Sequence, residues 1–182
     1  MSSLITTLAK SRLFKSDLDS QAAHVRSTAL AAVFLRLALA AGFLSAVADR
    51  FGLWGPAGTP GVGWGGFDPF LAYTGRLLWF LPASLVPAAG WAATVLEVTL
   101  AVGLLAGVRV RAFALASGLL LTVFAVVMTV ALGPEPPLSY SVWSAAAGAF
   151  LLASLQPAPA GPPEPGKIVL RSKGLAGRAK LS

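Results

Sequence analysis

The apolar residues of this chain are gathered into long, almost uncharged segments instead of alternating with polar residues. A helix that crosses the ~30 Å hydrocarbon core of a membrane needs about 20 mostly apolar residues, because it rises ~1.5 Å per residue. Four segments have this character: residues 28–48, 88–107, 112–132 and 138–155. The pattern therefore predicts an all-α integral membrane protein, a bundle of four spanning helices.

Prolines separate the predicted spans, since proline cannot continue a helix. The three prolines within residues 134–137 predict a tight hairpin between the third and fourth spans. Pro82 and Pro87 separate the second span from residues 70–81, whose aromatic side chains suit a membrane interface. We therefore expect a short interfacial helix over residues 70–81, within an outer loop of residues 49–87.

The basic residues predict an orientation. The sequence carries 14 Lys and Arg against 7 Asp and Glu, a net charge of +7, although only 12% of its residues are charged. Eleven of the basic residues lie in residues 1–27, in the turn between the second and third spans, or in residues 156–182. These three regions share one side of a four-span topology, so the positive-inside rule predicts that both termini are cytoplasmic.

Three regions of different composition follow. Residues 1–27 form a cytoplasmic amino tail with a short surface helix, residues 28–155 form the membrane domain, and residues 156–182 form a Pro-rich linker and a basic cytoplasmic tail. A nucleic-acid-binding protein would instead carry Lys and Arg in stripes on a polar surface, so we expect no nucleic-acid partner. The expected surroundings are the lipid bilayer.

The composition excludes several kinds of chemistry. With no cysteine, the chain has no disulfide, thiolate nucleophile or Cys-ligated zinc, and with His24 as its single histidine it has no multi-histidine metal or haem site. The glycine-rich loop of residues 55–66 lacks the G-x-G-x-x-G spacing and is expected to be a flexible outer loop. No self-contained catalytic constellation emerges, so catalytic residues are unknown and enzymatic activity stays open. We expect no metal and no covalently bound cofactor.

Two charged residues lie inside predicted spans. Arg36 and Glu97 stand about 12 Å and 15 Å from the cytoplasmic ends of the first and second spans. Each charge costs on the order of 2.5–3.5 kcal/mol to insert, so we expect the two to form a midplane ion pair. The pair either joins two helices and does nothing more, or holds Glu97 as a group that titrates or contacts a ligand.

A second candidate site lies at the outer interface. Asp49 and Arg50 end the first span, where the simplest interpretation is a half-exposed ion pair, and interfacial aromatics are mostly anchors. The alternative is an amphipathic pocket for a quinone-like headgroup whose tail stays in lipid. Its candidate ligand-binding residues are Asp49, Arg50, Arg76, Trp79, Trp91, Tyr140 and Trp143, with Trp64 nearby.

Several short motifs in residues 28–155 are similar to those of the DoxX-like membrane proteins, a broad bacterial group. They are Phe-Leu-Arg-Leu at 34–37, Asp-Arg-Phe-Gly at 49–52, Glu97, and the Gly-Leu-Leu-Ala-Gly-Val-Arg-Val-Arg-Ala run at 103–112. The resemblance implies a four-helix bundle in the bacterial plasma (inner) membrane. It also implies a link to quinone-coupled redox chemistry, because DoxD-type subunits belong to thiosulfate:quinone oxidoreductases. A Lys that commonly follows the first helix in the family is replaced here by Asp49 and Arg50.

Three functional hypotheses remain. The first is a partner-dependent subunit, with a soluble or membrane redox partner, that offers a lipid-like or quinone-like ligand a site near Arg36 and Glu97. The second is a small-solute or proton pathway in which Glu97 titrates. The third is a purely structural membrane scaffold. The sequence leaves the oligomeric state open.

Overall fold

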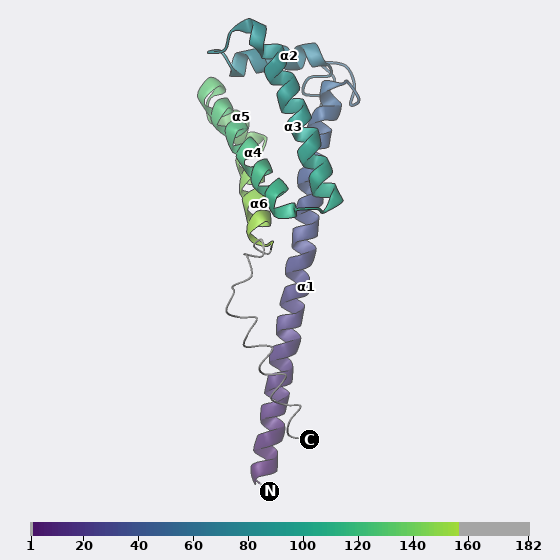
Figure 1. Ribbon diagram of the computed structural model, residues 1–182, viewed down its shortest axis with the longest axis vertical. Helices are drawn as coiled ribbons and strands as arrows, with labels where there is room; N and C mark the ends of the chain where they lie inside the picture. The colour runs from purple at the N-terminus through teal and green to yellow at the C-terminus, as the bar shows by residue number, and fades with distance from the viewer. Residues whose placement is uncertain (1, 157–182) are drawn as a thin grey trace, which may run out of the picture.

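In the computed structural model, which describes the backbone of residues 2–156 and the side chains of residues 17–156, the described chain consists of helices and turns without a β-strand. Figure 1 shows the helices standing side by side along the upper part of one very long helix. The predicted linker and basic tail lie outside the described residues, apart from Gln156. The helices are α1 (Ser2–Arg50), α2 (Phe67–Leu77), a 3-10 turn η1 (Ala83–Leu85), α3 (Val86–Ala106), α4 (Val110–Leu132), α5 (Glu135–Ser139) and α6 (Val142–Ser154).

Helix α1 joins the predicted amino tail and the first span into one element. Its 49 residues give a length of about 73 Å, more than twice the ~30 Å hydrocarbon core. The expected boundary near residue 27 is absent because neither proline nor glycine occurs between Ser2 and Ala41 to end the helix. The separate surface helix expected in the amino tail is therefore wrong. The amino-terminal half of α1 instead projects beyond the bundle (Figure 1).

The interfacial helix is found as α2, which begins three residues before the predicted segment of residues 70–81 and ends four residues before its end. Beyond Leu77 the chain forms a turn, in which the Leu81 amide donates to the Leu78 carbonyl. Proline disfavours helical geometry in the residue before it, so Pro82 ends helical structure in this segment early. Figure 1 shows α2 lying across the end of the bundle where α1 ends, which we call the loop end.

The second and third predicted spans are found as α3 and α4, with boundaries that differ from the prediction by at most two residues. Gly107 ends α3 in the left-handed conformation (φ 71°), where glycine has no steric penalty. Together with the carboxyl-terminal part of α1, three helices are long and apolar enough to cross a membrane. The α3–α4 turn lies at the opposite end of the bundle, which we call the turn end.

The fourth predicted span is not one continuous helix. The chain from residue 135 onward forms the short α5 and then the 13-residue α6, separated at Ser141, whose φ of 57° breaks the helical geometry. At ~1.5 Å per residue α6 is about 20 Å long, shorter than the hydrocarbon core. With three helices of membrane-spanning length, the chain is a multi-pass membrane protein. A fourth crossing and the orientation of the termini stay predictions.

The helices pack in two main pairs, α4 against α6 and α1 against α3. Small residues allow close approach: an added Cβ on Gly118 would lie 2.8 Å from the Phe150 ring, and one on Gly103 would collide with Phe113. Buried apolar residues such as Phe43, Leu104 and Leu152 fill the interior. Many large apolar side chains face outward on α1, α3 and α4, as expected for helices in contact with lipid.

Candidate functional site

The candidate site is built on a buried ion pair between the carboxyl end of α1 and the middle of α3. Arg50 donates from Nη2 to Glu97 Oε1 over 2.6 Å and from Nη1 to Thr94 Oγ1 over 2.9 Å. The two charged residues are only 3% and 1% exposed. Because both charges are removed from solvent, each depends on the other for compensation.

Aromatic rings from the loop end close over the arginine. The guanidinium carbon of Arg50 lies 4.1 Å from the centroid of the Phe70 ring and 5.5 Å from that of Trp64. Both distances fall within the range of cation–π attraction, and the rings also displace solvent. Phe70 of α2 and Trp64, three residues before α2, therefore cover the arginine from the loop end.

The predicted partner of Glu97 was wrong. The structure pairs Glu97 with Arg50, while the Arg36 side chain lies at the turn end, its Nη1 3.1 Å from the position of a Cβ on Gly107. Glu97 is ten residues from Gly107 along α3, or about 15 Å, so it lies well above the level of Arg36. Arg50 is about 21 Å above Arg36 along α1, and its helical side chain slants back toward the amino terminus, which brings the guanidinium down to Glu97.

Asp49 has a different role from its neighbour. It was expected to pair with Arg50 at a half-exposed rim, but it is 7% exposed and accepts three backbone hydrogen bonds instead. The amides of Gly63 and Trp64 donate to Oδ2 at 3.0 and 2.9 Å, and that of Gly65 donates to Oδ1 at 3.2 Å. Successive amides of this kind make an anion-binding concavity. The glycine-rich loop, expected to be flexible, is thus fastened to α1 by an internal carboxylate.

A large cavity adjoins the ion pair. It has a volume of about 1000 Å³ and lies between α1, α2, α3 and α4, with α5–α6 residues at its edge. Its walls are predominantly apolar, and Gly42 faces open space there, since an added Cβ would meet nothing within 4 Å. Glu97 Oε2 and Arg50 Nε are buried and have no hydrogen-bond partner among the described residues. Both residues line the cavity, so one acceptor and one donor without a partner among the described residues lie together within its wall.

The structure brings together only some of the residues predicted for the outer pocket. Asp49, Arg50, Arg76 and Tyr140 all line the central cavity. The remaining three do not line it and are partly or largely exposed: Trp79 at 70%, Trp91 at 49% and Trp143 at 38%. Trp91 packs on Phe51 and Phe67, and Trp79 on Phe80.

Two residues of the site were not predicted. Thr94 lies three residues before Glu97, and this spacing predicts that both side chains are on the same face of α3. Phe70 gave no such signal, because only the folding of α2 over the bundle brings its ring to Arg50. Among residues 17–156, no group of three or more His, Asp or Glu is placed to hold a metal ion.

Comparisons with protein-family models, with curated proteins and with solved structures give no match for this chain. Similarity to the DoxX-like proteins therefore stays a prediction from the motifs.

Proposed function

We propose that this chain binds a lipid-like or quinone-like molecule in its central cavity, with the headgroup at the Arg50–Glu97 pair. The observation that carries the proposal is Glu97 Oε2, a carboxylate oxygen buried in the wall of a cavity of about 1000 Å³ without a protein partner. A buried acceptor left without a donor is costly, so the site favours an occupant that supplies one.

The charges and the lining define the chemistry of the ligand. Arg50 and Glu97 compensate each other, so a neutral headgroup adds no unbalanced charge to the interior. A hydroxyl group donates to Glu97 Oε2, and a carbonyl or hydroxyl oxygen accepts from Arg50 Nε. The apolar walls suit a hydrocarbon or isoprenoid tail. A quinone and its quinol meet these requirements together, the quinol as donor and both as acceptors.

The chain acts as a subunit in this proposal. Its side chains include no cysteine and no multi-histidine site, so an electron that reaches a bound quinone comes from a partner protein. The motifs similar to DoxX-like proteins support this assignment, because the DoxD-type members are subunits of quinone-linked oxidoreductases. In this arrangement the chain positions the ligand in the membrane, and the partner supplies the redox centre.

Binding of a decyl-substituted benzoquinol to the full chain in lipid nanodiscs tests the proposal. Gly42→Phe fills the cavity, whereas the adjacent Ala41→Phe points away from it and serves as the control. Glu97→Gln removes the free carboxylate acceptor, and Glu135→Gln, at an exposed residue, is its control. We expect each of the two to weaken binding about tenfold or more, Glu97→Gln through loss of a hydrogen bond to a charged group and Gly42→Phe because its ring occupies the space of the ligand.

Equal affinity in all four variants would overturn the proposal. Absence of quinol binding together with a proton flux into proteoliposomes that depends on Glu97 would favour the pathway hypothesis instead.

A further inference from the structure

A second cavity lies at the turn end of the bundle, away from the ion pair. It has a volume of about 480 Å³, is open on one side, and is lined by α1, by the start of α4 and by the end of α6. None of its lining residues is acidic. They are His24, Val25, Thr28, Ala29, Ala32, Val33, Arg36, Val110, Leu152, Leu155 and Gln156.

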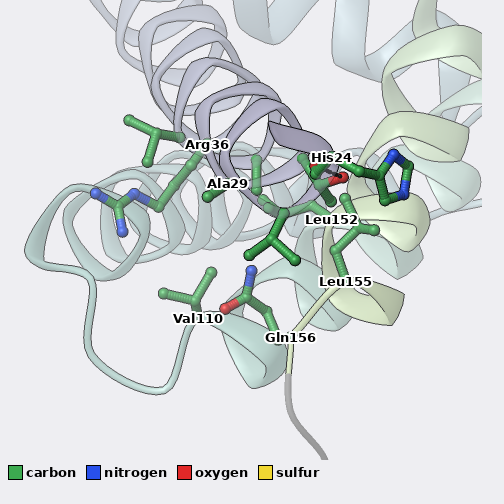
Figure 2. Close-up of a pocket in the computed structure, with 11 residues that line it drawn as sticks. His24, Ala29, Arg36, Val110, Leu152, Leu155 and Gln156 are labelled. Atoms are coloured by element: carbon green, nitrogen blue, oxygen red, sulfur yellow. Dashed lines mark hydrogen bonds between the residues drawn. The ribbon is translucent and has the colours of Figure 1, made fainter. Parts of the chain in front are cut away.

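The polar residues of this cavity are spread along its length. Figure 2 shows Arg36 and Val110 toward one end and His24 toward the other, with the amide of Gln156 between them. Leu152 and Leu155 of the α6 end provide apolar surface beside them. The combination of a cation, an amide and an aliphatic wall matches a charged headgroup that continues into a hydrocarbon chain.

Arg36 has a buried donor that no other described residue of the protein satisfies. Its Nε is buried and has no hydrogen-bond partner among the described residues, although an arginine offers five donors. The guanidinium lies against the α3–α4 turn, where an added Cβ on Gly107 would stand 3.1 Å from Nη1. A guanidinium at this place presents a planar set of donors, which suits the oxygens of a phosphate.

The surrounding charge has the same sign. Val110 lines the cavity and is flanked in the chain by Arg109 and Arg111. Basic clusters at the end of a membrane helix attract anionic lipids, at about 1 kcal/mol per Lys or Arg near the surface.

We propose that this cavity binds the phosphate of an anionic phospholipid, with Arg36 as the principal ligand and the acyl chain against the aliphatic wall of α1 and α6. The site is separate from the central cavity and does not depend on the function proposed there. Because Glu97 pairs with Arg50, Arg36 is left to bind the phosphate in this proposal.

Native mass spectrometry of the full chain, titrated with phosphatidylglycerol or with phosphatidylcholine of the same acyl composition, tests the site. We expect tighter binding of phosphatidylglycerol to the unmodified chain, and a loss of about tenfold in Arg36→Gln. Arg26→Gln, an exposed basic residue on the same helix that does not line the cavity, is the matched control and should change affinity less than about threefold.

A steric pair of variants keeps the proposal testable if Arg36→Gln does not fold. Ala29→Phe places a ring in the cavity, whereas Ala31→Phe places one on an exposed part of α1 outside it. Only Ala29→Phe should weaken phosphatidylglycerol binding, again by about tenfold, as a blocked site requires.

Three outcomes would overturn the site. Equal losses in Arg36→Gln and Arg26→Gln would show a diffuse basic surface, and equal binding of the two lipids would show that the phosphate charge is not recognised. Displacement of phosphatidylglycerol by millimolar inorganic phosphate would show a site for the free anion and not for a lipid.

Discussion

Arg50 and Glu97 are 47 positions apart in the chain, yet a 2.6 Å hydrogen bond joins Nη2 of the arginine to Oε1 of the glutamate inside the bundle. This contact fixes the end of α1 against the middle of α3. It also places a carboxylate and a guanidinium at the wall of the cavity of about 1000 Å³. Structural support and the proposed ligand recognition thus depend on the same two side chains.

Removal of one member of this pair should be costly. We expect Arg50→Met to destabilise the protein by about 3–5 kcal/mol, because Glu97 is left as an uncompensated buried charge. The double variant Arg50→Met/Glu97→Met should recover most of this loss. Unfolding in detergent, followed by circular dichroism, measures both, and Arg76→Met at an exposed position is the control. If the double variant is less stable than the single one, the contact contributes more than charge compensation.

The Asp49 carboxylate should determine the order of the glycine-rich loop. Asp49→Ala removes the acceptor of three backbone amides, and we expect a loss of about 2–3 kcal/mol, since hydrogen bonds to charged groups contribute about 1.5–3 kcal/mol each and some amides will rebind water. Limited proteolysis between residues 55 and 66 should become much faster. Asp68→Ala, at an exposed position on α2, should leave the cleavage rate unchanged. Slow cleavage of Asp49→Ala would show that other contacts hold the loop.

Gly65 should not tolerate a side chain. Its φ is +64°, and an added Cβ would collide with the backbone of Pro56 and Ala57. Gly61 has a similarly unfavourable φ of +84° but open space around it. Backbone strain of this kind costs about 1–3 kcal/mol, so Gly61→Ala should show that cost alone and Gly65→Ala a larger one. Thermal unfolding of the two variants measures the difference, and equal midpoints would contradict the collision.

The predicted topology can be mapped because the chain contains no cysteine. Single cysteines at Ser20, Gly58 and Ser172 probe the amino end, the glycine-rich loop and the carboxyl tail. If both termini are cytoplasmic, a membrane-impermeant maleimide added to intact cells should label only Gly58→Cys. Labelling of Ser172→Cys but not of Ser20→Cys from outside would instead show that the chain crosses the membrane an odd number of times, with α6 not spanning it.

Hydrophobic patterning was sufficient to predict most helices. α3 and α4 begin and end within two residues of the predicted spans, because an apolar segment bounded by glycine, proline or arginine leaves little choice of helix ends. The same approach failed at residues 138–155, where it predicted one continuous helix. Ser141 adopts a left-handed conformation there that the local sequence does not indicate. It also failed at the start of α1, where a change from polar to apolar side chains does not interrupt a backbone without glycine or proline.

The candidate site was predicted in part. Glu97 was singled out because a carboxylate inside an apolar segment needs a partner, and Arg50 and Asp49 because they end a span. Which cation pairs with Glu97 was not predicted, and neither was the capture of Asp49 by the amides of residues 63–65. Both depend on contacts between segments that are distant in the chain.

The sequence by itself determined that the chain forms long apolar helices and that Glu97 requires a cation inside them. These properties follow from the composition of single segments and from the cost of burying a charge. Only the tertiary structure decided that the cation is Arg50 and that Arg36 remains at the other end of the bundle. The physical reason is axial register: the position at which α3 lies along α1 is set by side-chain packing and by residues 51–85, which join the two helices. A shift of about 20 Å along α1 exchanges one arginine for the other.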